Sequence, residues 1–284
     1  MKTKQVLSDF FPREQRTRYA EDFPKLSRSE RKSRKQLEVA NQQIIRYADD
    51  INMTILELRD ANEKLQNSFL DTIHRLVLAA EYKEEETGNH IIRMSRYSAL
   101  IAEKLGLSKK EVQNILYASP LHDLGKIGIP DSILLKPGKL TDEEFTIMKT
   151  HTIIGANILA YSKAEVLQVA EQIAISHHEK WNGSGYPQGL SGEKIPMVGR
   201  IVGLADVFDV LTSKRPYKEP YPIEVAVDII EKERGQSFDP NIGDTFLECV
   251  DEIVAIKEEV DKTEVVRTAD FTYSERDLIK HIYE

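Results

Sequence analysis

A large aliphatic side chain recurs at every seventh position in the first quarter of the chain, and this repeat limits the fold more than any other feature. A seven-residue apolar repeat aligns such side chains along one stripe of a helix, which is the seam of a coiled coil. We expect one long helix over about residues 30–83. It either pairs with a second copy of the chain in a parallel homodimer or packs on the chain's own domain. The repeating positions are Leu37, Ile44, Ile51, Leu58 and Leu65.

Helical patterns continue along most of the remaining chain, whereas strand patterns are sparse. The capping box of a helix start occurs at "SKKE" (108–111), "TDEE" (141–144) and "SKAE" (162–165). The glycine- and proline-rich segments "IPDSILLKPGKL" and "WNGSGYPQGLSGEKIP" predict loops. We therefore expect an all-α bundle preceded by the long helix. Its predicted helices cover about residues 89–105, 109–123, 142–160, 163–178, 197–212, 222–234 and 240–260.

Charge is unevenly distributed. Residues 1–35 hold eleven Lys or Arg and five Asp or Glu, a net charge of +6, so the remainder carries −14 of a total of −8. An acidic main body argues against nucleic-acid binding. The basic arm is read as a solvated, partly disordered tail, with contact to an acidic partner or a membrane surface as the alternative.

Cysteine content and hydropathy bound the compartment. The single cysteine, Cys249, excludes an intramolecular disulfide and suits a reducing environment. The first residues lack the apolar segment of a signal peptide, and no apolar run approaches the ~18 residues of a membrane span. We expect a cytoplasmic protein without a transmembrane segment.

Five of the seven histidines stand beside carboxylates or beside one another. Burying an imidazole against a carboxylate is costly unless a partner compensates both, and a metal ion does so. Helical bundles bring such groups to one centre from several helices. His74 and His281 fall outside these patterns and are read as surface or packing residues. The candidate metal ligands are Glu86, His90, His122, Asp123, His151, His177, His178 and Asp206.

The ligand types narrow the metal and the chemistry. Imidazoles mixed with carboxylates suit Fe(II), Mn(II) or Zn(II), and one cysteine argues against a thiolate zinc site. Eight candidates exceed the ligand number of one ion, so more than one metal is implied. A carboxylate such as Asp123 can bridge two metals. Metals about 3.5–4 Å apart are a device for phosphoester hydrolysis, because they lower the pKa of water and hold the oxygens of an in-line displacement.

Three segments carry a family resemblance, in this order: "HDLGKIGIPDSILLKPGKLT", "HHEKWNGSGYPQGLSGEKIP" and "ADVFDVLTSKRPYK". They closely resemble the HD-GYP branch of the HD phosphohydrolase superfamily over roughly residues 69–250. The resemblance implies an HD-type helical catalytic domain over residues 69–262. That domain hydrolyses cyclic di-GMP to pGpG, and in some members to GMP, with two or three divalent metals, Fe(II) or Mn(II). Residues 1–68 then form a basic arm and helical input region, and residues 263–284 a C-terminal extension with a short helix at 274–283.

The resemblance also implies roles for single residues. Asp123 bridges metals, and Lys126 contacts the scissile phosphate, so both are candidate catalytic residues. Glu86 matches the extra carboxylate of members with three metals. The loop Gly185–Pro187 is the "GYP" motif, which is associated with shaping the site and with docking partner signalling proteins. The implied substrate-binding residues are Lys126, Tyr186, Arg215 and Lys218.

Departures from the family pattern are slight, and two other functions stay open. Asn182 and Lys214 stand where aspartate is expected, and Gly199 where alanine is more usual. One alternative is a non-catalytic adaptor that acts through the GYP loop and the coiled coil, although a complete ligand set argues against it. The other is an HD hydrolase of another nucleotide such as cyclic GMP–AMP, since base discrimination depends on pocket geometry.

Overall fold

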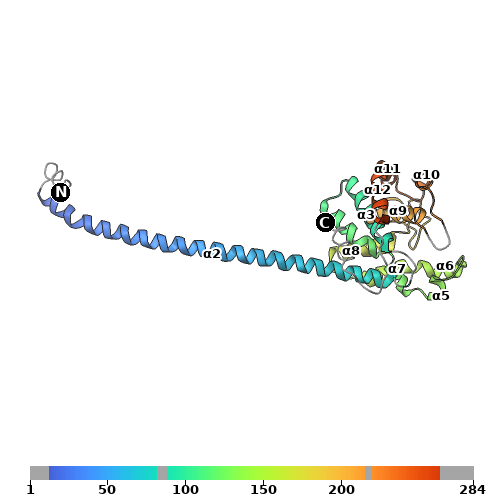
Figure 1. Cartoon of the computed structure of the whole chain (residues 1–284), viewed down its shortest axis with the longest axis horizontal. Helices are drawn as coiled ribbons and strands as arrows, with labels where there is room; N and C mark the ends of the chain where they lie inside the picture. The colour runs from blue at the N-terminus through green and yellow to red at the C-terminus, as the bar shows by residue number, and fades with distance from the viewer. Residues whose placement is uncertain (1–12, 82, 84–87, 215–218, 263–284) are drawn as a thin grey trace. The chain divides into compact units, whose positions relative to one another are not determined.

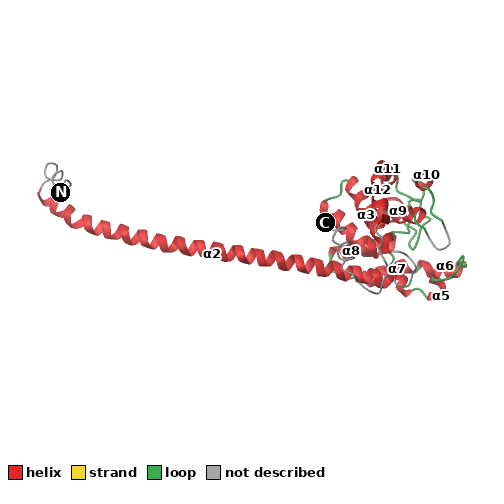
Figure 2. Cartoon of the chain, viewed as in Figure 1, coloured by secondary structure: helices red, strands yellow, loops and turns green. Residues whose placement is uncertain are grey.

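The computed structural model describes residues 13–81, 83, 88–214 and 219–262. Within this part the chain forms helices and loops, and it has no extended strand beyond two isolated bridges (Figure 2). The all-α prediction is confirmed. The chain divides into two units, residues 1–68 and residues 69–284. None of the described helices combines the length and apolar character that a bilayer crossing requires.

The first element, α2 (Arg13–Glu81), is one continuous helix of 69 residues (Figure 1). The predicted long helix is confirmed, but its start is wrong, because the helix begins well before residue 30. Residues 13–35 are rich in Arg, Lys, Glu and Gln, which are favourable helix formers. The reading of the basic arm as partly disordered is therefore wrong from Arg13 onward. The seam side chains Leu37 to Leu65 are 59% to 69% exposed in the single chain.

The second unit is a bundle of shorter helices that follow one another through short connections (Figure 1). Helix α3 packs on α4, α9 and α12, while α7 packs on α8 and on η2. The elements are α3 (Gly88–Lys104), α4 (Lys109–Ala118), η1 (Ser119–Leu121), η2 (Leu124–Gly128), α5 (Asp131–Leu134), α6 (Asp142–Lys149), α7 (His151–Leu159), α8 (Glu165–Ser176), η3 (Gly192–Lys194), α9 (Met197–Thr212), α10 (Ile223–Glu233), α11 (Pro240–Glu248) and α12 (Val250–Lys262).

One apolar core joins these helices. It takes Tyr97 from α3, Ile173 from α8 and Phe208 from α9, all fully buried. Tyr97 and Phe208 meet edge to face, with ring centroids 5.7 Å apart. The last turns of α2 also join this core through Ile73 and Val77. The core therefore fixes α3, α8 and α9, which carry predicted metal ligands at or just beyond their ends.

Proline ends the predicted helix 109–123 early. Helix α4 stops at Ala118, and Pro120 lies in the first turn of the 3₁₀ segment η1. Proline has no N–H to donate to the preceding turn, so the α-helical ladder cannot continue through it. His122 and Asp123 consequently lie in the short connection between η1 and η2 rather than on a helix.

Two more predicted helices are split, and one predicted cap is wrong. The segment 142–160 breaks at Thr150, so His151 begins α7 instead of lying inside a helix. The segment 240–260 breaks at Cys249. The capping boxes at Ser108 and Thr141 are confirmed. The one at Ser162 is wrong, because its hydroxyl accepts from the N–H of Ala164, two residues on, and α8 begins only at Glu165.

Candidate metal centre

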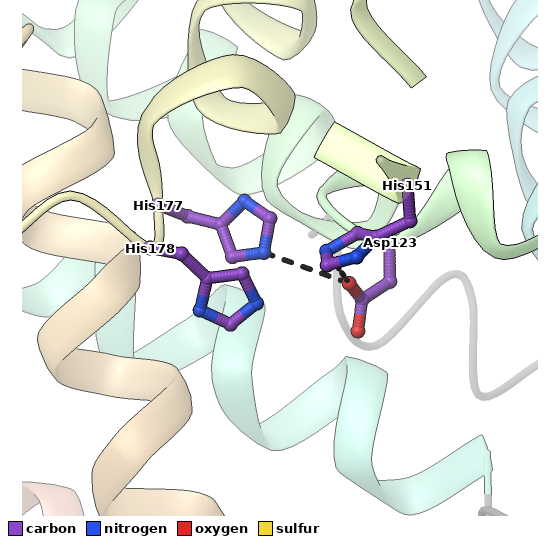
Figure 3. A group of neighbouring side chains, drawn as sticks. All are labelled: Asp123, His151, His177 and His178. Carbon is purple, nitrogen blue, oxygen red and sulfur yellow. Dashed lines mark ion pairs between the residues drawn. The ribbon is translucent and has the colours of Figure 1, made fainter. Parts of the chain in front are cut away.

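Asp123 is the hub of the site. Its Oδ2 lies 3.1 Å from Nε2 of His122, while its Oδ1 lies 3.2 Å from Nε2 of His151 and 3.5 Å from Nε2 of His177. In Figure 3 the imidazoles of His151 and His177 reach the carboxylate from two different segments, with His178 next to His177. The two oxygens of one carboxylate thus face two different sets of imidazoles.

Three imidazoles of the site have the same hydrogen-bonding arrangement. Each ring places its Nδ1 against a backbone carbonyl of its own turn, so Nδ1 carries the proton and Nε2 keeps its lone pair. These lone pairs point to the centre of the site, as metal-binding histidines require. The Nδ1-to-oxygen distances are 3.0 Å for His122 to Ser119, 2.7 Å for His151 to Met148 and 3.1 Å for His177 to Ile173.

The converging atoms lack hydrogen-bond partners. Nε2 of His122, His151 and His177 and Oδ1 of Asp123 are buried without a partner in the described structure. All four are electron-pair donors, so they cannot satisfy one another. Buried groups without partners are costly, and a cation at their centre removes the cost. The residues present therefore fit a metal site.

The candidate ligands fall into two groups. Within each group, one ligand atom per residue lies within 4.8 Å of all the others. The structure thus brings seven of the eight predicted ligands together, while Glu86 lies outside the described residues. Arg215 and Lys218 also lie outside them. The first group is Asp123, His151, His177 and His178, and the second is His90, His122 and Asp206.

The cluster concentrates negative charge in a buried place. Burial alone would raise the pKa of the Asp123 carboxyl, but Lys126 and His122 outweigh burial and hold that pKa well below its usual value. Burial opposes charge on His122, yet Asp123 and Asp206 raise its pKa. At His177 burial dominates and lowers the pKa. Asp123 therefore stays ionised, and positive charge is favoured on its His122 side.

A buried ion pair that sequence reasoning missed supports His90. Asp209 on α9 lies 2.8 Å from Nδ1 of His90 and accepts two hydrogen bonds from Arg93, at 2.6 and 2.8 Å. Arg93 also donates to Asp261 of α12 at 2.8 Å. Burial alone would raise the pKa of Asp209, but Arg93 and His90 hold it far below its usual value. Asp209 therefore stays ionised and orients the His90 ring, leaving Nε2 3.7 Å from Asp206.

A signal for this pair was present in the sequence. Arg93 follows His90 by three residues, and Asp209 follows Asp206 by three. Residues three apart share a helix face, so each candidate ligand has a charged neighbour on its own side of the helix. The signal was ambiguous, because such charges usually lie on solvated faces. Only the packing of α3 against α9 identifies Arg93 and Asp209 as buried partners, 4% and 1% exposed.

We expect Asp209→Asn to weaken metal binding by about 10- to 100-fold, the usual effect of losing such a supporting group. The amide cannot accept from both His90 and Arg93, so the His90 ring loses its fixed orientation. Metal affinity is measured by competition with a chelator of known affinity.

A matched control is Glu259→Gln, which alters the exposed partner of Arg96 between α3 and α12. An exposed pair of this kind contributes at most about 1 kcal/mol and should leave metal affinity unchanged. Equal effects of the two substitutions would contradict the assigned role of Asp209.

Lys126 and Tyr186, both predicted to bind substrate, border the cluster. Nζ of Lys126 lies 2.9 Å from Oδ2 of Asp123. The Tyr186 ring lies nearly parallel to the His178 ring, with centroids 4.7 Å apart and 30° between the planes. Burial raises the pKa of the Tyr186 hydroxyl, so it stays a hydrogen-bond donor at neutral pH.

The GYP loop is held in place by a buried carboxylate that sequence reasoning also missed. Glu179 follows His178 directly, and its oxygens accept the backbone N–H groups of Gln188 and Leu190 at 2.7 and 2.9 Å. The backbone N–H of Tyr186 donates to the carbonyl of His178 at 3.2 Å. The loop is therefore anchored on the segment that carries two candidate ligands.

The departures from the family pattern have local explanations in two cases. A Cβ at Gly199 would lie 2.0 Å from the hydroxyl oxygen of Ser176, so this pair of positions favours glycine. The side-chain oxygen of Asn182 accepts the N–H of Ser184 at 2.9 Å within the loop. Nothing in the structure explains Lys214, which is exposed.

Seven candidate ligands gathered around an adjacent His–Asp pair define a class of helical metal-binding domain. The chain belongs to the HD domain family, which matches residues 71–242. The resemblance to HD-GYP phosphodiesterases is thereby confirmed, since relatives named as cyclic di-GMP phosphodiesterases align over the same region.

Three curated relatives illustrate the similarity. A "cyclic di-GMP phosphodiesterase" of Thermotoga maritima is 47% identical, over 67% of this chain and 52% of its own length. The "cyclic di-GMP phosphodiesterase response regulator RpfG" of Xanthomonas campestris is 50% identical, over 62% and 47%. The "3′3′-cGAMP-specific phosphodiesterase 2" of Vibrio cholerae is 42% identical, over 79% and 41%. The chain spans about half the length of the curated relatives it matches.

Proposed function

We propose that this chain is a metal-dependent phosphodiesterase that hydrolyses cyclic di-GMP to pGpG, to GMP, or to both. The observation that carries the proposal is the placement of Asp123, whose two oxygens face separate ligand groups. A carboxylate in that position suits a bridge between two ions. Similarity to relatives named as cyclic di-GMP phosphodiesterases supports the choice of substrate.

The protein's own residues have distinct proposed roles. Divalent ions held at this site would supply an activated water and stabilise charge on the phosphoryl oxygens. Lys126 would offset charge on a non-bridging phosphate oxygen, while Tyr186 would donate a hydrogen bond to substrate. The proposed ligands are Glu86, His90, His122, Asp123, His151, His177, His178 and Asp206, and the proposed substrate contacts beyond the described residues are Arg215 and Lys218.

The proposal extends to the metals and the domains. Fe(II) or Mn(II) suits a mixture of imidazoles and carboxylates. Residues 69–262 would form the catalytic domain, residues 1–68 an input region and residues 263–284 an extension. The GYP loop would also offer a surface to partner signalling proteins.

Product analysis tests the proposed activity. The full chain is purified without oxygen, loaded with Fe(II) or Mn(II), and incubated with cyclic di-GMP beside chelator-treated protein. Turnover to pGpG or GMP that depends on metal would support the proposal. Metal-loaded protein that leaves cyclic di-GMP intact would contradict it.

A second candidate substrate is cyclic GMP–AMP, which is favoured by the 42% identity to a relative named as specific for 3′3′-cGAMP. Both dinucleotides carry two phosphodiesters and differ in one base. Comparison of kcat/KM for the two substrates decides between them. Absence of turnover on both, with metal bound, would favour the non-catalytic adaptor.

We further propose that the seam of α2 forms a parallel homodimer. Introducing Ile51→Asp together with Leu58→Asp places charges in that seam and should convert a dimer to a monomer in light-scattering measurements. Met53→Asp with Leu56→Asp is the matched control, since these exposed residues lie off the seam on the same helix. A dimer that survives the seam substitutions, or wild-type protein that is monomeric, would contradict the proposal.

A further inference from the structure

An aromatic wall leads away from the metal centre. The rings of His177 and His178 have centroids 4.0 Å apart, and those of His178 and Tyr186 are 4.7 Å apart. The ring of Phe145 continues the series, 6.2 Å from Tyr186 at an interplanar angle of 79°. Phe145 lies on α6 and is 43% exposed. A large aromatic side chain is therefore held in solvent next to a candidate ligand group.

Lys149 completes this wall. It lies four residues after Phe145 on α6, hence on the same face of the helix. Its Nζ is 4.6 Å from the centroid of Phe145 and 5.5 Å from that of Tyr186, which is cation–π distance. Its side chain is partly buried.

The charge of Lys149 is not neutralised by an ion pair in the described structure. Two other lysines of this region each meet a carboxylate, Lys126 with Asp123 and Lys136 with Glu144. Lys149 has ring contacts only. A partly buried ammonium group facing two aromatic rings has donors available for a ligand, because Lys carries three N–H donors and no acceptor.

We propose that Phe145 and Lys149 form a guanine-binding subsite beside the metal centre. The base stacks on the exposed Phe145 ring, while the Lys149 ammonium donates to acceptors on the base edge. Guanine presents two adjacent acceptors, O6 and N7, whereas adenine replaces one with an amino donor. A pure donor at this position therefore selects guanine.

This inference rests on the proposed function, since it assumes that a phosphate of the nucleotide reaches the metal centre. The site would hold one phosphodiester of a cyclic dinucleotide, and the wall would read one of its bases. Continuity of the rings from His178 to Phe145 supports this placement.

Binding of mononucleotides tests the subsite without relying on turnover. The full chain is loaded with Mn(II), and 5′-GMP and 5′-AMP are titrated by calorimetry. We expect wild-type protein to bind GMP about tenfold more tightly than AMP, in line with one specific base contact. Lys149→Met should remove this preference, and Lys149→Arg should keep it. Phe145→Ala should weaken both nucleotides about tenfold through lost stacking.

Controls separate the subsite from folding and from the proposed activity. Lys163→Met removes an exposed lysine at the far ends of α7 and α8 and should bind as wild type. Metal content is measured for every variant, so a binding change at full metal content supports the subsite. An unchanged GMP-to-AMP ratio in Lys149→Met, unchanged binding in Phe145→Ala, or no nucleotide binding by wild type would overturn it. Failure of cyclic di-GMP turnover alone would overturn only the proposed activity.

Discussion

Asp123→Ala is expected to lower phosphodiester turnover by roughly 10³-fold or more. Several kcal/mol of charge stabilisation depend on the metals, and each 1.36 kcal/mol corresponds to a factor of ten in rate. Asp123 is the one described residue whose two oxygens face both ligand groups. Its removal also leaves Lys126 without its carboxylate partner. Rates are compared under saturating Mn(II) with cyclic di-GMP as substrate.

A second readout keeps this prediction independent of catalysis. Metal that binds only the folded protein raises Tm by mass action, so wild type should gain stability when Mn(II) is added. Asp123→Ala should gain much less. Asp131→Asn is the control, because Asp131 pairs with Lys83 at 3.1 Å and is 68% exposed. Wild-type turnover and an undiminished Tm gain in Asp123→Ala would refute the central role of this carboxylate.

Gly125→Ala is expected to be the most damaging substitution that adds a single carbon. A Cβ there would lie 1.8 Å from the carbonyl oxygen of His151 and 2.4 Å from the backbone nitrogen of Gly155. Both atoms belong to the backbone of α7, so no side-chain rotation relieves the overlap. We expect a loss of about 3 kcal/mol or more, which corresponds to a fall in Tm of roughly 10 °C.

The same substitution should also impair the metal site. Because His151 begins α7, a shift of that backbone moves its imidazole away from Asp123. Gly128→Ala is a matched control in the same 3₁₀ segment, where a Cβ would meet only the side chain of Ile154 at 3.0 Å. We expect it to cost less than about 1 kcal/mol, since a flexible side chain can yield. Thermal unfolding and metal content of both variants decide the point; equal values would rule out the close approach as the cause.

The extent of agreement between sequence and structure follows from the range of the interactions involved. The long helix, the helix Met197–Thr212 and two of three capping boxes depend on neighbouring residues, and the structure confirms them. The breaks at Thr150 and Cys249 were missed, because no proline or glycine marks them. Pro120, by contrast, was visible in the sequence and should have ended the helix at Ala118.

The candidate site divides in the same way. Residue types and spacing sufficed to name the imidazoles and carboxylates that suit metal ions. They did not indicate that the ligands divide into two groups, because that depends on which oxygen of Asp123 faces which helix. Arg93 and Asp209 were missed because a charged residue on a helix looks the same in sequence whether it is solvated or paired in the core. Lys149 and Phe145 were missed because their neighbour Tyr186 is distant in the chain.

By itself, the sequence determined the helical class, the family and the chemical character of the centre, because local periodicity and short motifs encode them. Only the tertiary structure decided the orientation of each imidazole, the buried support of His90 and the aromatic wall beside the metal centre. These features arise where helices far apart in the chain approach one another. Such contacts are fixed by packing of the whole core, through residues such as Tyr97 and Phe208, and no single segment contains them.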